Sequence, residues 1–334
     1  MASSGDLVLV TGACGYLACH VIQQLQRAGY RVRGTVRKAE MNDDEQIRPI
    51  RELCPDAKHP VVELFEADLL EPETWPAAVA ACSYVIHTAS PFPVEPPDDP
   101  DDVIKPAVEG TLSVLRAARD AGCVKRVVMT SSAAAVCDDY TKDDRMYNET
   151  DWTDVAKDLP AYTKSKTLAE KAAWDFVAAL SGDDKFELAV MNPGFFIGPV
   201  LNRPGSASTS LPKLFMERAL PAVMHMCLPT IDIRDVAAAH VAAMTLPEAA
   251  GKRHILANGT LWFRELAQFL YDEFHANGYD VLTEEEPAKP DAPGLFYVDN
   301  TRMLEVLKIK PRPLRESFVE MARGLIDAGF IVKK

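Results

Sequence analysis

The chain opens with an apolar run, a glycine-rich turn and a helical pattern, and this order constrains the fold more than any other feature. Residues 7–11 are rich in Val and Leu and predict a buried strand. A helical pattern from Gly15 to Ala28 follows the turn Gly12-Ala13-Cys14-Gly15. Gly12 suits a tight turn, and Gly15 lets the backbone approach a pyrophosphate at the helix N-terminus. The order predicts a dinucleotide-binding turn, with a plain structural turn as the alternative.

Further apolar runs alternate with helical patterns along the first half of the chain. The pattern predicts a helix starting near Pro72, long helices over residues 103–121 and 161–180, and a loop over residues 91–102. Strands are expected at residues 31–36, 61–66, 84–88, 126–131 and 186–191. This alternation predicts an α/β fold with a Rossmann-type, doubly wound parallel sheet.

The alternation fades after Asn192, which predicts a second, smaller unit. We expect residues 1–193 to bind the cofactor, with residues 231–258 returning to that domain. Residues 194–334 are expected to form mainly a C-terminal α/β substrate-binding domain.

Composition and charge narrow the class of partner. The chain has 36 Lys and Arg against 49 Asp and Glu, a net charge of −13, which argues against nucleic acid as a partner. The seven cysteines include no C-x-x-C pair, and no metal site is expected. We find no secretory signal and no apolar segment of about 20 residues. These features predict a cytoplasmic protein without a membrane partner, either a monomer or a homodimer.

The end of the second predicted strand indicates which dinucleotide binds. NAD enzymes usually carry an acidic residue here, whereas this chain has Arg37 and Lys38, which suit the 2′-phosphate of NADP. A solvated charge pair is the alternative. Asp68, after the third strand, could bind the adenine amino group or cap a helix. Thr88-Ala89-Ser90 follows the fourth strand, at the sheet edge where ligands bind.

Tyr162 and Lys166 lie four residues apart in a predicted helix, so their side chains are neighbours. Reduction of a carbonyl needs a proton on oxygen, and we expect the Lys166 ammonium to lower the tyrosine pKa and make the phenol a usable acid. Ser131 and Ser132 end the fifth strand, and we favour Ser132 as the hydroxyl that stabilises charge on the substrate oxygen. Without the dinucleotide turn, the Tyr–Lys pair would be an ordinary surface pair.

Together these motifs resemble the extended (atypical) short-chain dehydrogenase/reductase family. Within it, the chain is similar to the dihydroflavonol reductase and cinnamoyl-CoA reductase branch and to fungal NADPH-dependent methylglyoxal and carbonyl reductases. The resemblance implies a seven-stranded parallel sheet, NADP(H), and transfer of the pro-S hydride. The matching segments are Thr11-Gly12-x-x-Gly15-x-x-Ala18, Asp68-Leu69, His87-Thr88-Ala89-Ser90, Thr130-Ser131-Ser132-Ala133, Tyr162-x-x-x-Lys166 and Asn192-Pro193-Gly194.

The predicted site has three groups of residues, some of them shared. The catalytic residues are Ser132, Tyr162 and Lys166. The substrate residues are Phe92, Ser132, Cys137, Tyr162 and Phe195. The cofactor residues are Thr11, Gly12, Cys14, Gly15, Tyr16, Leu17, Arg37, Lys38, Asp68, Leu69, Thr88, Ala89, Ser90, Thr130, Tyr162, Lys166, Pro193, Gly194 and Phe196.

The predicted activity is NADPH-dependent reduction of an aldehyde or ketone to an alcohol. Phe195 belongs to a cluster of aromatic and Met residues that suits an apolar or aromatic carbonyl compound, although ordinary core packing is the alternative. Cys137 stands where plant dihydroflavonol reductases carry a substrate-reading asparagine. A hydroxysteroid-type dehydrogenase, a dihydroflavonol reductase, an epimerase and a non-catalytic NADP-sensing protein remain alternatives. We interpret residues 232–236 and His225 as structural.

Overall fold

The computed structural model describes residues 5–91, 97–137, 145–288 and 294–333. Its largest feature is a sheet of seven strands in which all neighbouring pairs are parallel. The strand order reverses between β1 and β4, which creates a switch point where ligands bind in such sheets. The predicted Rossmann-type sheet is therefore confirmed. In spatial order the strands are β3 (Val62–Glu66), β2 (Arg31–Val36), β1 (Leu7–Val10), β4 (Tyr84–His87), β5 (Arg126–Thr130), β7 (Glu187–Pro193) and β10 (Lys252–Leu256).

Helices cover both faces of this sheet because successive strand residues point to opposite sides. Val8 and Val10 face a core formed with α1 (Tyr16–Arg27) and α8 (Ile233–Thr245). Leu7 and Leu9 face a second core, to which the other helices contribute. These helices are α4 (Trp75–Val79), α5 (Asp101–Ala121) and α6 (Ala161–Ala178).

The predicted elements are present, but several ends differ. The helix expected near Pro72 begins as a 3₁₀ turn (Pro72–Thr74) before α4. Helix α5 starts at Asp101 rather than 103, since its two first-turn aspartates favour the positive end of the helix dipole. Strand β7 continues to Pro193 because it pairs with β10 up to Leu256. Two short helices, α2 (Lys38–Met41) and α3 (Asp44–Arg51), were not predicted.

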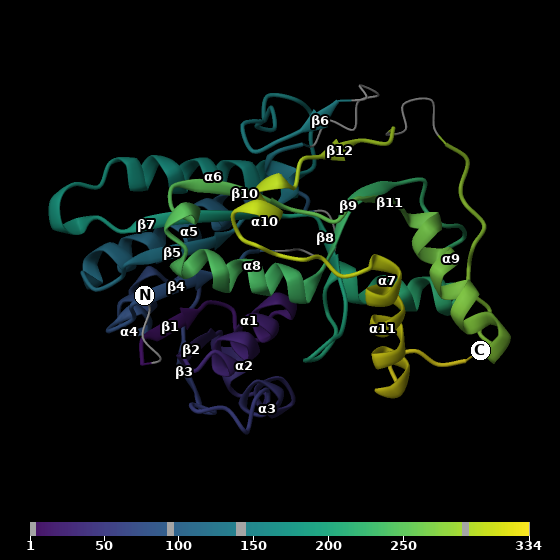
Figure 1. Ribbon diagram of the computed structural model, residues 1–334, viewed down its shortest axis with the longest axis horizontal. Coiled ribbons are helices and arrows are strands. Elements are labelled where there is room, and N and C mark those ends of the chain that lie inside the picture. Colours follow the sequence, from purple (N-terminus) through teal and green to yellow (C-terminus); the bar gives the residue numbers. More distant parts are fainter. Residues whose placement is uncertain (1–4, 92–96, 138–144, 289–293, 334) are drawn as a thin grey trace.

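A smaller group of elements gathers at one end of the molecule (Figure 1). Its three-stranded sheet contains β8 (Phe195–Ile197), β9 (Cys227–Asp232) and β11 (Thr260–Trp262). Helices α7 (Ala207–Met216), α9 (Phe263–Phe274) and α11 (Leu314–Asp327) pack with this sheet around a third core. The remaining elements are the paired strands β6 (Met146–Tyr147) and β12 (Tyr297–Val298) and helix α10 (Thr301–Glu305).

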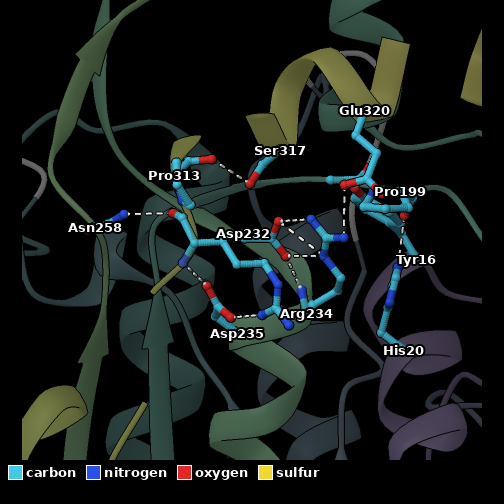
Figure 2. A network of polar contacts seen from close by, with 12 residues as sticks. Tyr16, His20, Pro199, Asp232, Arg234, Asp235, Asn258, Pro313, Ser317 and Glu320 are labelled. Atoms are coloured by element: carbon cyan, nitrogen blue, oxygen red, sulfur yellow. Dashed lines mark hydrogen bonds and ion pairs between the residues drawn. The ribbon is translucent and has the colours of Figure 1, made fainter. Parts of the chain in front are cut away.

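A polar network with a buried carboxylate at its centre links the two groups of elements (Figure 2). Asp232, which has no exposed surface, caps α8 through the Arg234 amide at 2.7 Å and accepts from the Arg234 guanidinium at 2.6 Å. Arg234 also pairs with Glu320 of α11 at 2.8 Å. The Tyr16 hydroxyl of α1 donates to the Gly198 carbonyl at 2.6 Å. Residues 232–236 therefore have the structural role expected from the sequence.

Two further observations concern the cysteines and the helices. All seven cysteines are free thiols, and burial raises the pKa of both Cys14 and Cys19 to about 12, so these thiols stay protonated. Among the described residues, no helix is long and apolar enough to cross a membrane.

Candidate active site

The glycine turn has the conformation that the sequence predicts. Gly12 has a φ of +66°, and a Cβ added there would lie 3.2 Å from the Ala89 Cβ. Thr35 holds the turn, since its hydroxyl accepts from the Gly12 amide at 3.0 Å and its carbonyl accepts from the Ala13 amide at 2.7 Å. Gly15 is the N-cap of α1 and offers no side-chain cap. The first amides of α1 therefore remain available to an anionic group.

Thr11 supports the turn from inside the protein. Its hydroxyl has no exposed surface, contacts the His87 ring at 2.9 Å and accepts from the amides of Thr88 and Ala89 at 3.0 Å each. These bonds fasten the carboxyl ends of β1 and β4 together at the switch point. Thr11 thus supports the site from beneath and does not line the cleft itself.

A cleft of about 750 Å³ runs along this edge of the sheet, within the range of small-molecule sites. It brings together much of the predicted cofactor set: Gly12, Cys14, Gly15, Tyr16, Arg37, Asp68, Leu69, Thr88, Ala89 and Ser90. Other predicted cofactor residues lie outside its lining: Thr11, Leu17, Lys38, Thr130, Tyr162, Lys166, Pro193, Gly194 and Phe196.

Arg37 and Lys38 differ in their relation to this cleft. Arg37 lines it, with its side chain 67% exposed, and donates from Nε at 3.0 Å and Nη2 at 2.6 Å to one oxygen of Glu40. Arg37 thus lines the cleft and also belongs to a solvated charge pair with Glu40. The position expected of a phosphate-binding residue and the alternative of a solvated charge pair therefore do not exclude each other. Lys38 is the exposed first residue of α2.

Asp68 also lines the cleft, and part of its role is local. Its Oδ1 accepts from the Leu70 amide at 2.9 Å, and its carbonyl accepts from the Trp75 indole at 2.9 Å. Glu71, rather than Asp68, precedes the 3₁₀ turn as its N-cap. The helix-cap alternative for Asp68 is therefore wrong, since its carboxylate accepts from Leu70 in the turn that precedes Glu71.

The sequence analysis missed one wall of the cleft. Arg203, Pro204, Gly205 and Ser206, from the segment between β8 and α7, line it. Asn202 ties this segment to the glycine turn, because its Nδ2 donates to the Cys14 carbonyl at 3.2 Å. The Ser206 cap of α7 was visible in the sequence, but nothing local indicated that it meets Cys14.

Ser132, Tyr162 and Lys166 meet beside this cleft. Ser132 follows β5, the strand that neighbours β4, and its Oγ accepts from the Ala134 amide at 3.1 Å in a 3₁₀ turn (Ala133–Ala135). Tyr162 is in the first turn of α6, hydrogen-bonded to the Ser132 side chain. The Lys166 Nζ, one turn further, lies 5.8 Å from the Tyr162 ring centroid. Each of the three is buried or half-buried.

The titration behaviour of this group corrects one expectation. Burial raises the pKa of Tyr162, and the hydrogen bond with Ser132 lowers it only in part. The expectation that Lys166 lowers the pKa of Tyr162 is therefore wrong, because burial makes the charged phenolate costly. Burial lowers the pKa of Lys166 to about 8, and the Glu170 carboxylate opposes this shift. At neutral pH the group therefore consists of a neutral phenol beside an ammonium.

Thr130, Pro193 and Gly194 hold the backbone around this group. The Thr130 hydroxyl lies 2.8 Å from the His240 ring of α8. Pro193 ends β7, and the Gly194 amide donates to the Leu256 carbonyl at 3.0 Å. A Cβ at Gly194 would lie 2.2 Å from the Pro229 carbonyl oxygen, so the chain passes β9 too closely for any other residue.

The predicted substrate residues are placed less uniformly. Phe92 lies outside the described residues. Cys137 is buried in a packed cluster with Tyr147 and Phe296, and its thiol donates to the Ala133 carbonyl at 3.5 Å. Phe195 is half-buried on β8, with its ring 5.8 Å from that of Phe263. Phe196 packs on Tyr16 at 5.8 Å, and Leu17 is a core residue.

Comparison with known proteins places this fold and site in a family. The family model "NAD dependent epimerase/dehydratase family" matches residues 8–257. The chain is 33% identical to an uncharacterized oxidoreductase of Schizosaccharomyces pombe, covering 96% of this chain and 97% of that protein. It is 32% identical to a cinnamoyl-CoA reductase of Medicago truncatula, covering 99% of each. The chain therefore belongs to the NAD dependent epimerase/dehydratase family.

A solved structure agrees with this assignment. The crystal structure of yeast methylglyoxal/isovaleraldehyde reductase Gre2 complexed with NADPH superimposes with a TM-score of 0.81 at 28% identity. The match covers 97% of this chain and 100% of that one. These findings confirm the resemblance to extended short-chain dehydrogenases/reductases and the prediction of an NADP-dependent oxidoreductase.

Proposed function

We propose that this chain reduces an apolar or aromatic aldehyde or ketone to an alcohol with NADPH, and that Tyr162 is the proton donor. One observation carries the proposal: Tyr162 is hydrogen-bonded to Ser132 and faces Lys166 at the sheet edge that also forms the cleft. Reductases among the relatives, and a similar structure that contains NADPH, support it.

The cleft fits a dinucleotide phosphate in its chemistry. The uncapped N-terminus of α1 offers amides to the pyrophosphate, and Gly12 keeps the turn close to Ala89. Arg37 would hold the 2′-phosphate, and Asp68 the adenine end. NADPH, when bound, would supply the hydride to the carbonyl carbon.

The side chains then act on the carbonyl oxygen. The Tyr162 hydroxyl gives its proton to this oxygen, and Ser132 donates a hydrogen bond that stabilises the charge developing there. The Lys166 ammonium stabilises the phenolate that remains on Tyr162. A raised tyrosine pKa suits this role, since the group must carry its proton at the start.

We also propose the division of labour expected from the sequence. Residues 1–193, with 231–258, would hold the cofactor, and residues 194–334 would form most of the substrate side. Phe195 and Cys137 would border the substrate, as would Phe92, which lies outside the described residues. The half-buried Phe195 offers an apolar surface to a carbonyl compound.

The test is NADPH consumption, followed by absorbance, with a panel of aromatic and aliphatic aldehydes and ketones. We expect Tyr162→Phe to lower kcat by about 10²–10⁴-fold, the usual contribution of general acid catalysis. NADPH binding, measured by fluorescence, should remain. Tyr271→Phe, which removes a hydroxyl from α9 outside the site, is the matched control and should keep its activity.

Full activity in Tyr162→Phe would rule out the proton-donor role. Tight NADPH binding by the wild-type chain without turnover of any carbonyl would instead favour a cofactor-sensing protein.

A further inference from the structure

Glu170 is a buried carboxylate that the proposed chemistry does not use. It lies on α6 one turn after Lys166 and has no exposed surface. Its Oε2 accepts from Ser131 Oγ at 2.6 Å and from Asn192 Nδ2 at 2.8 Å. Its Oε1 accepts from Arg253 Nε at 2.6 Å and from the Trp174 indole at 3.2 Å. Both oxygens are thus satisfied by donors from β7, β10, α6 and the end of β5.

Arg253, the charge partner of Glu170, reaches the turn that carries Ser132. It is 6% exposed on β10, and its guanidinium stacks 3.8 Å from the centre of the Trp152 ring. Its Nη2 donates to the Ala135 carbonyl at 3.2 Å, at the end of the turn that Ser132 begins. Its Nη1 donates to the carbonyls of Glu149 and Asp151.

A second connection runs through Asn192. The amide nitrogen that donates to Glu170 also donates to the Ser132 carbonyl at 3.2 Å. The backbone of Ser132 is therefore bound on one side through Asn192, and its neighbour Ser131 binds the Glu170 carboxylate directly. Ser131, before Ser132, donates to the Glu170 carboxylate, and Ala135, after it, accepts from Arg253, which pairs with Glu170. Glu170 lies on α6, the helix that also carries Tyr162 and Lys166.

A buried ion pair is weak evidence for a stabilising role. A buried ion pair costs desolvation, and well-packed apolar residues often stabilise a core as well or better. A buried carboxylate with both oxygens satisfied does fix one arrangement of its donors, because any shift leaves a buried charge unpaired. Asn192 Oδ1 is the buried atom of this network that has no partner among the described residues.

We infer that Glu170 and Arg253 are positioning residues, which hold the Ser132 turn against α6 so that Ser132 and Lys166 keep their places around Tyr162. The inference rests on the proposed reductase function. Neither residue would touch the substrate.

A matched control exists at the far end of the same strands. Arg126, at the start of β5, is 5% exposed and donates to Glu187 at 2.6 Å and to the carbonyls of Ala243 and Leu246 at 2.6 Å each. Arg126→Lys and Arg253→Lys therefore remove the same guanidinium from comparably buried positions, although the side chain of Glu187 is 56% exposed and that of Glu170 is buried. Only the second pair adjoins the proposed site.

The test compares Glu170→Gln, Arg253→Lys and Arg126→Lys in the full chain. We expect the first two to lower kcat at least tenfold while the Kd for NADPH changes less than about threefold. Arg126→Lys should lower the Tm, because it removes donors to the Ala243 and Leu246 carbonyls, and should keep kcat within twofold. Ser131→Ala, which removes a single donor, covers the case in which the charge variants do not fold; we expect a three- to tenfold lower kcat.

A pH profile separates positioning from general destabilisation. Among the described residues, Lys166 is faced by Tyr162 and Glu170 of its own helix and by His87 of β4. Glu170 raises the pKa of Lys166, so its neutralisation should move the alkaline limb of the kcat profile to lower pH. Arg126→Lys should leave this limb in place.

Hydrogen exchange gives a readout that does not depend on turnover. Glu170→Gln and Arg253→Lys should speed amide exchange in residues 131–136, and Arg126→Lys should not. If the wild-type chain reduces no carbonyl, the proposed function fails, and the exchange comparison alone decides whether the network holds the turn. If the wild type is active and Glu170→Gln, Arg253→Lys and Ser131→Ala all keep kcat and the pH profile, the inference is overturned.

Discussion

Single side chains at the carboxyl edge of the sheet decide what the cleft can bind. Arg37 lines the cleft and donates to Glu40, a carboxylate that lines the cleft as well. Lys38, the next residue, begins α2 and lies outside the lining. Arg37 and Lys38 are both exposed cations after β2, but only Arg37 lines the cleft.

Replacement of each cation by alanine tests this difference. Arg37→Ala should raise the Kd for NADPH about tenfold or more, because a charge-assisted hydrogen bond contributes about 1.5–3 kcal/mol. The Kd for NADH should change less than about twofold, since NADH carries no 2′-phosphate. Lys38→Ala is the control and should leave both values near those of the wild type. An equal loss for NADPH and NADH in Arg37→Ala would contradict a phosphate-binding role.

The sequence predicts site residues that belong to local motifs. It does not predict site residues that come together only when distant parts of the chain fold against each other. Gly12, Gly15 and Arg37 stand next to a strand end, so the pattern of neighbours revealed them. Arg203 reaches the same cleft from more than 160 residues further along the chain. Glu170 and Arg253 are 83 residues apart, and no spacing in the sequence indicates that they pair.

Whole elements were more predictable than their ends. Apolar runs mark a buried parallel strand, but its length depends on the partner strand. Strand β7 extends to Pro193 because β10, which arrives some 60 residues later, pairs with it there. Directly after Pro193 the backbone passes close to β9, and Gly194 is the residue at this close contact.

Gly194→Ala should therefore destabilise the protein by about 3 kcal/mol, the upper range for overpacking a well-packed site. The new Cβ would meet the Pro229 carbonyl oxygen, which belongs to backbone and cannot swing away. Gly324→Ala is the matched control, since it is exposed within α11 and has open space for a Cβ. It should stabilise the protein by about 0.5–1 kcal/mol. Urea unfolding measures both, and equal effects would show that the crossing at Gly194 is loose.

For the whole molecule, buried histidines couple folding to pH. His20, His87, His240 and His254 are each at most 3% exposed, and in each at least one ring nitrogen makes a hydrogen bond. Desolvation lowers the pKa of His87 to about 3 and that of the other three to about 4. In the unfolded chain an imidazole titrates near 6.5, so below that pH the unfolded state binds more protons than the folded state.

The free energy of unfolding should therefore fall as the pH falls from about 6.5 to 5, by about 1.4 kcal/mol per pH unit for each proton taken up. Burial raises the pKa of Glu149, so this carboxyl takes up its proton more readily in the folded state and opposes the trend as the pH falls. His254→Gln should reduce the slope of the unfolding free energy against pH by the contribution of about one proton, even though the substitution also lowers the free energy of unfolding at every pH. His275→Gln, at an exposed position, is the control. Urea unfolding at several pH values measures the slope, and an unchanged slope in His254→Gln would mean that this imidazole is already protonated in the folded protein.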